Sequence, residues 1–94
     1  MMDIRLYCYR DKNVGFGAPF AQSNDYTAKR AFAIAVNDSR PTDVAFAPAD
    51  FDLYFVGTFD TMSAKFKPVN DGIPEFVVNG ASLVSAPPSS PADA

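Results

Sequence analysis

At residues 24–36 the chain reads Asn24-Asp25-Tyr26-Thr27-Ala28-Lys29-Arg30-Ala31-Phe32-Ala33-Ile34-Ala35-Val36. Alanine is the strongest helix former, and the Ser, Asn and Asp side chains at 23–25 are the types that cap a first turn. The run therefore predicts a helix from Asp25 to Val36 or Asn37. The stripe of a helix that faces the core has the spacing i, i+4, i+7, i+8. Ala28, Phe32, Ala35 and Val36 have this spacing. Such a stripe suits packing on a sheet.

The segment before this helix has the two-residue period of a half-buried strand. Between residues 4 and 10, Ile4, Leu6 and Cys8 alternate with a second set, Arg5, Tyr7 and Tyr9. We expect the first set to face the helix, with Cys8 buried and inert, and the second set to lie on the opposite face.

Turn-forming residues divide the rest of the chain. A Gly-rich loop at 11–19 leads to a short extended piece near residues 20–21, and Pro41 ends the helical region. One turn is expected at 48–51, followed by strands at 52–59, 64–69 and 73–78 and a possible short strand at 81–84, arranged as a meander. The predicted fold class is α+β, with an antiparallel sheet of about four strands in strand-helix-strand-strand-strand order and one helix packed on one face.

The length of 94 residues fits one domain, which we place at residues 1–85. Residues 86–94 contain three prolines and almost nothing apolar, so we expect a disordered Pro/Ser/Ala tail. A small core and sheet edges with few blocking devices predict a homo-oligomer, most simply a dimer.

Composition argues against an enzyme. The chain has no histidine and one cysteine, which removes the usual general base, the nucleophile pairs and a closed zinc site. We expect no catalytic residues, no cofactor and no metal. Carboxylates at Asp43, Asp50, Asp52 and Asp60 allow a hard cation, but solvated turn and strand-edge carboxylates are the simpler interpretation. No apolar run is long enough to cross a bilayer, and no signal peptide begins the chain, so we expect no membrane contact and a cytoplasmic protein.

A net charge of −3 argues against generic attraction to nucleic acid. However, proteins that hold single strands combine aromatic rings for base stacking with cations along the backbone. The polar side of the first strand and its predicted neighbours offer that mixture, in Arg5, Tyr7, Tyr9, Tyr54, Lys65 and Lys67. Lys29 and Arg30 on the helix are the next candidates. The same residues also fit an exposed face that keeps a small sheet soluble.

The order of motifs resembles a known family. The strand ending in Tyr9-Arg10-Asp11-Lys12, the loop to Ala18-Pro19-Phe20 and the helix with Ala28-Lys29-Arg30-Ala31-Phe32 precede a Pro-x-Asp-Phe-x-Leu-Tyr-x-x-Gly-x-Phe-Asp segment at 48–60. Over residues 4–67 this resembles the small nonstructural, DNA-binding protein of gokushovirus-type microviruses. The resemblance implies a phage protein made in the infected bacterial cytoplasm, absent from the virion, that acts on single-stranded genome synthesis or its hand-over to packaging.

Two functions follow as hypotheses. The first is a protein that binds single-stranded DNA through the residues named above and modulates viral DNA replication. The second is an interaction module that binds a phage or host replication protein without contacting DNA. Salt separates them, because direct phosphate contacts release counterions.

Overall fold

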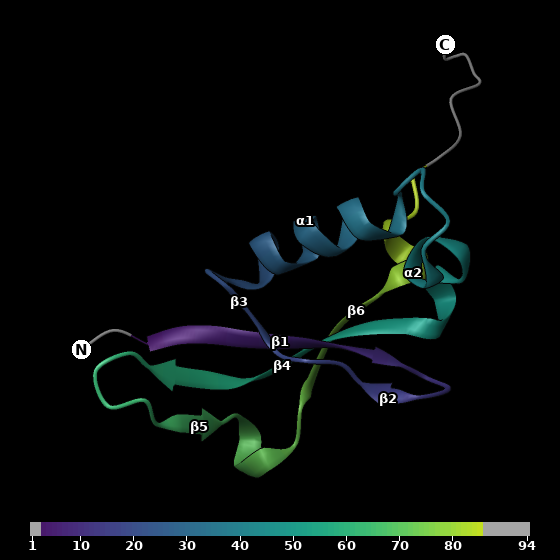
Figure 1. Ribbon diagram of the computed structural model, residues 1–94. Coiled ribbons are helices and arrows are strands. Elements are labelled where there is room, and N and C mark those ends of the chain that lie inside the picture. Colours follow the sequence, from purple (N-terminus) through teal and green to yellow (C-terminus); the bar gives the residue numbers. More distant parts are fainter. Residues whose placement is uncertain (1–2, 86–94) are drawn as a thin grey trace.

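The computed structural model describes residues 3–85 (Figure 1). In chain order the elements are β1 (Asp3–Asp11), β2 (Gly15–Phe16), β3 (Phe20–Gln22), α1 (Asp25–Val36), α2 (Asp43–Phe46), η1 (Pro48–Asp50), β4 (Phe51–Asp60), β5 (Phe66–Pro68), η2 (Asn70–Gly72), β6 (Glu75–Asn79) and η3 (Gly80–Leu83). The elements labelled η are single 3₁₀ turns. The predicted 86–94 tail lies outside the described residues.

One antiparallel sheet of six strands organises the molecule. The long strands β1 and β4 pair along their whole length at its centre, and the order is β2-β1-β4-β5, with β3 also on β1 and β6 also on β4. The α+β class and the antiparallel sheet with one main helix are confirmed. The meander was wrong, because β6 pairs with β4 and not with β5. Residues 80–83 form η3 instead of a strand, and Gly15–Phe16 is a short strand where only a turn was predicted.

Helix α1 begins and ends where the sequence predicted. Asn24 caps it: its side-chain oxygen accepts a hydrogen bond from the backbone N–H of Thr27 at 2.9 Å, and the Thr27 hydroxyl oxygen accepts one from the backbone N–H of Asn24 at 3.2 Å. These reciprocal bonds satisfy donors that an uncapped first turn leaves without partners. Ala28, Phe32 and Val36 are buried, as the stripe requires.

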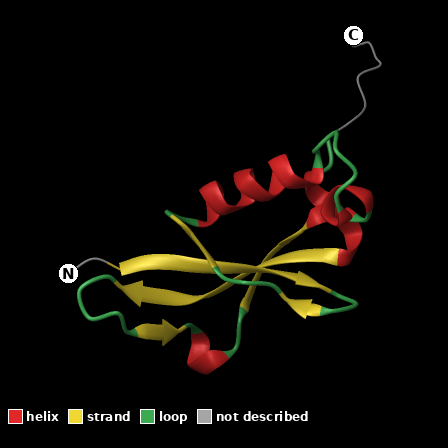
Figure 2. Cartoon of the chain, in the orientation of Figure 1, coloured by secondary structure: helices red, strands yellow, loops and turns green. Residues whose placement is uncertain are grey.

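The core lies between α1 and one side of the sheet, which we call the helix face. Phe32 from the helix packs there among Tyr7, Leu53 and Phe55, and side chains from α2 and η3 close the cluster. Figures 1 and 2 show α1 above the sheet and α2 gathered with the neighbouring turns at one end. Within residues 3–85 no helix packs on the other side of the sheet, which we call the open face.

Two β-bulges decide which residues face which way. Leu6 lies opposite Gly57 whereas Tyr7 lies opposite Phe55, so Val56 is an extra residue in β4. Leu53 lies opposite Val78 whereas Tyr54 lies opposite Phe76, so Val77 is extra in β6. Each bulge reverses the alternation of its own strand. As a result, large apolar side chains point to both faces of the sheet.

Candidate functional site

Three aromatic rings from three strands meet on the open face. Phe16 of β2 contacts Tyr54 of β4 with ring centroids 5.1 Å apart, and Tyr54 contacts Phe76 of β6 at 5.8 Å. We call these three residues the aromatic row. Both contacts are edge-to-face, with interplanar angles of 70° and 79°. Phe16 remains 49% exposed and Phe76 58% exposed, so ring surface at both ends of the row is open to a flat partner.

The strand registers place the row. Phe16 lies opposite Arg10, and Tyr54 lies opposite Cys8 on one side and Phe76 on the other. Directly opposite residues of an antiparallel pair share a face. Phe76 meets Tyr54 only because Val77 bulges out of β6, since an unbulged strand would place Val77 opposite Tyr54.

One cation accompanies the row. The guanidinium carbon of Arg10 lies 5.9 Å from the centre of the Phe16 ring, within range of a cation–π contact. Cys8 is buried beneath, and burial raises the pKa of its thiol, which keeps it protonated. Asp52 is also buried and accepts a hydrogen bond from the side-chain amide of Asn79 at 2.7 Å. The row therefore presents aromatic surface and a positive charge, with its nearby carboxylate already occupied.

Tyr7 and Tyr9 are not on the open face, so their prediction as exposed stacking residues was wrong. Tyr7 is completely buried, and Tyr9 packs on Phe32 with ring centroids 4.7 Å apart. Alternation correctly grouped them with Arg5 but did not say which group faces the helix. The larger rings bury more apolar area against α1 than Ile4, Leu6 and Cys8 would, and burial scales with area. Those three residues point to the open face instead.

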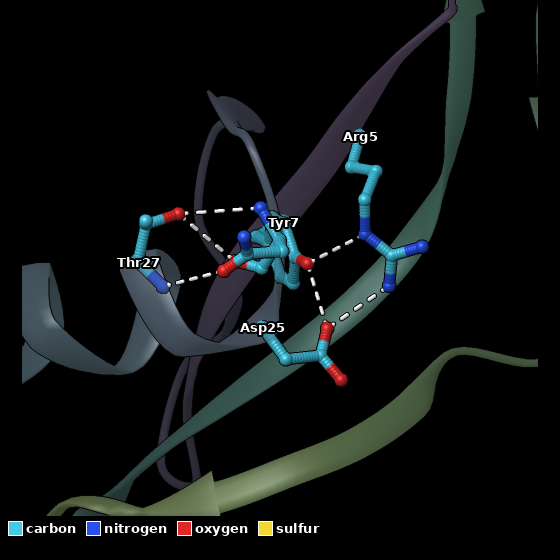
Figure 3. Close-up of polar contacts among 5 residues, drawn as sticks. Arg5, Tyr7, Asp25 and Thr27 are labelled. Carbon is cyan, nitrogen blue, oxygen red and sulfur yellow. Dashed lines mark hydrogen bonds and ion pairs between the residues drawn. The ribbon is translucent and has the colours of Figure 1, made fainter.

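Arg5 and Tyr7 belong to a network that fastens α1 to the sheet (Figure 3). The Tyr7 hydroxyl donates to a carboxylate oxygen of Asp25 at 2.7 Å and accepts from Nε of Arg5 at 2.8 Å, while Arg5 also pairs with Asp25 at 2.9 Å. The hydrogen bond from Tyr7, followed by Arg5, lowers the pKa of Asp25, whereas burial chiefly raises the pKa of Tyr7. Arg5 is thus engaged in holding the fold.

The other four predicted lysine and arginine contacts also lie away from the row. Lys67 lies opposite Thr58, which lies opposite Arg5, so Lys67 is on the helix-face side of the sheet. Lys65 and Lys67 line an open depression of about 250 Å³ there, together with Asp3 and Asp60, which offset their charge. Lys29 and Arg30 are exposed on α1. Of the predicted set, only Tyr54 lies in the row.

Sequence reasoning missed Phe16, Phe76 and Arg10. Continuing the alternation of β1 beyond Cys8 places Arg10 on the same face as Cys8, which was a usable signal. Phe16 was assigned to a turn, and Phe76 depends on a bulge that alternation cannot show.

The described residues contain no group of three or more acidic, histidine or cysteine side chains placed to hold a metal ion. Among them there is also no helix long and apolar enough to cross a membrane.

Fold and site define a small α+β protein whose sheet exposes aromatic rings on one side and carries its helix on the other. Residues 4–83 match the family model of the phage ORF5 protein, and the chain belongs to that family. It is a bacteriophage protein. No curated protein and no solved structure matches it.

Proposed function

We propose that this phage protein binds single-stranded DNA through the aromatic row on its open face. In this role it is a nonstructural protein of a gokushovirus-type microvirus, acting in the cytoplasm of the infected bacterium on genome replication or on its hand-over to packaging. Membership of a phage family supports the setting, and the observation that carries the proposal is the row itself.

Open sheets bind single strands by stacking bases on aromatic side chains that project from neighbouring strands. Phe16 and Phe76 leave about half of their surface uncovered at the two ends of the row. Arg10 lies beside Phe16, where it can meet a backbone phosphate next to a stacked base. A duplex keeps its bases stacked inside, so the row favours single strands.

The test is fluorescence anisotropy with a labelled oligothymidine and a labelled duplex of equal length. We expect binding to the single strand, weakened by Phe16→Ala and by Phe76→Ala. Each lost stack costs about 1–3 kcal/mol, roughly 5- to 150-fold in affinity. Phe46→Ala is the matched control, because Phe46 is an 88% exposed phenylalanine on α2, away from the row. Equal losses for all three variants, or no binding at all, would contradict the proposal.

The outer side of α1 favours the alternative, an interaction module for a phage or host replication protein. Tyr26 and Ile34 are large, exposed apolar residues on this helix, and the guanidinium carbon of Arg30 lies 5.7 Å from the Tyr26 ring centre. Tyrosine and arginine are enriched at interface hot spots. A protein that binds neither oligonucleotide would promote this alternative.

A further inference from the structure

Beyond the row, the sheet continues as a three-stranded arm, formed by residues 3–6 of β1, 57–60 of β4, and β5. The apolar and the charged side chains of this arm lie on opposite sides of it. Ile4 lies opposite Phe59, and Phe59 lies opposite Phe66, so three apolar side chains form one line across the three strands on the open face. Leu6 lies next to this line, opposite Gly57.

All the charged residues of the arm lie on its other side. Asp3 lies opposite Asp60, and both line the depression that also contains Lys65 and Lys67. Arg5, on the same side, is paired with Asp25. Among residues 3–85, the apolar side of the arm therefore offers no cation to a phosphate and no charge that would attract an oppositely charged partner.

The apolar side of the arm is also smooth. Gly57 has no side chain, and the ring of Phe66 occupies the space where one would be: a Cβ built on Gly57 would lie 2.8 Å from Cζ of Phe66. The ring thus fills the gap above Gly57 while 48% of Phe66 remains exposed. Sheets pack face to face through such surfaces at a separation of about 10 Å.

We propose that the apolar side of the arm packs against the same surface of a second copy in a twofold-symmetric dimer. A twofold interface must be complementary to itself, and an uncharged, smooth patch meets its own copy without like-charge repulsion. Phe66 is the large, exposed apolar side chain of this patch, and covering it gives association a driving force.

The interface area sets the expected strength. A covered phenylalanine buries roughly 150–250 Å², so the half-exposed Phe66 adds about 100 Å², and its partly buried neighbours add less. This sum falls below the roughly 800 Å² per partner of a stable interface. We therefore expect a weak dimer, with a dissociation constant of about 10 μM to 1 mM.

Dimerisation does not depend on the proposed DNA binding, and it is measured without DNA. In sedimentation equilibrium from about 10 μM to 1 mM, the range of the expected dissociation constant, the average mass should rise from monomer toward dimer. Phe66→Lys should keep the protein monomeric across this range, whereas the control Phe46→Lys should dimerise like the unaltered chain. A chain that stays monomeric to 1 mM, larger open-ended assemblies, or equal weakening by both variants would overturn the proposal.

Phe66 covers Gly57, so Phe66→Lys can also disturb the fold. Amide chemical shifts of the unaltered protein, recorded over the same concentrations, provide a measurement that needs no variant. They should change at residues 4, 6, 59 and 66 and stay constant along α1. Changes confined to α1 would move the interface to the helix and exclude the arm.

Discussion

Asp25 lies where α1 meets the sheet, and it joins two kinds of interaction. It is the first residue of the helix, where a negative charge complements the positive end of the helix dipole, and it accepts hydrogen bonds from Tyr7 and Arg5. Tyr7 has its ring in the core and its hydroxyl in this network. A single carboxylate thus couples the orientation of the helix to that of the central strand.

Asp25 should make stability depend on pH. Its pKa in the folded protein is lowered from the ordinary value of 3.8, chiefly by the hydrogen bond from Tyr7. A depressed folded-state pKa adds stability that is complete above the unfolded value and is lost as the pH falls through the folded value. In Asp25→Asn we expect a lower free energy of unfolding than in the parent at pH 7, by at most about 1 kcal/mol for so exposed a pair. The difference in free energy of unfolding between the two proteins should shrink as the pH falls below about 4.

Urea denaturation of both proteins between pH 7 and pH 2.5 measures this difference. Asp38→Asn is a useful control, because Arg40 lowers the pKa of Asp38 to about 2 from only two residues away, and so local a pair can persist in the unfolded chain. A gap between parent and Asp25→Asn that stays constant with pH would show that the carboxylate charge contributes nothing through Tyr7 and Arg5.

At the residue scale, the sequence correctly predicted which side chains of β1 share a face, but not which face packs against the helix. Alternation correctly placed Arg5, Tyr7 and Tyr9 together and predicted that Cys8 is buried. Alternation could not decide which set faces the helix, because both sides of β1 are rich in apolar or aromatic residues and neither set is clearly the solvent-exposed one.

At the scale of elements, the sequence predicted the helix correctly from local signals but did not predict which strands pair. Capping residues, alanine content and the Phe32 stripe are all carried by neighbouring positions, so α1 was predicted correctly. The pairing of β6 with β4 and the two bulges depend on contacts between distant segments. The turn signals at residues 71–72 mark where the chain bends, but they do not say to which strand it returns.

Gly57 tests how tightly β4 and β5 are joined. It lies next to the Val56 bulge with a positive φ of 156°, and a Cβ there would clash with the backbone oxygen of Lys67. A backbone atom of a paired strand cannot move aside cheaply. Gly57→Ala should therefore destabilise the fold by at least about 1–3 kcal/mol from the backbone conformation alone, and it should weaken the β4–β5 pairing.

Chemical denaturation and amide hydrogen exchange in β5 measure these two effects. Gly17→Ala is the control, because its Cβ would meet only the Tyr9 carbonyl oxygen at an ordinary 3.7 Å. We expect that variant to be close to neutral. If Gly57→Ala were as stable as the control, β5 would not be held against β4 as tightly as the structure indicates, and the smooth surface of the arm would lose its basis.

At the scale of the whole molecule, the basic residues are dispersed over several surfaces. Arg5 and Arg40 are paired with carboxylates, Lys29 and Arg30 lie on α1, and Lys65 and Lys67 lie on the arm near Asp3 and Asp60. The net charge is −3, and the part of the chain that the structure describes gathers no broad positive surface to offer a nucleic acid. Any DNA binding must therefore depend on stacking more than on charge.

This distribution predicts a shallow salt dependence for binding to oligothymidine. For single strands the slope of log K against log salt is about −0.7 per neutralised phosphate. Arg10 is the cation at the row, and Lys12 follows in the exposed turn before β2. One or two phosphate contacts give a slope of about −0.7 to −1.4 per chain. Four contacts through Lys29, Arg30, Lys65 and Lys67 would instead give about −2.8.

Anisotropy titrations at several salt concentrations, kept below the range where the protein dimerises, measure the slope. Arg10→Gln should make it shallower by about 0.7, and Lys29→Gln should leave it unchanged because Lys29 lies on α1, which is across the sheet from the row. A slope near −2.8 that Lys29→Gln reduces would place the DNA on the helix and remove the row from the site. A shallow slope that Arg10→Gln reduces, together with the losses expected for Phe16→Ala and Phe76→Ala, would locate the strand across the open face.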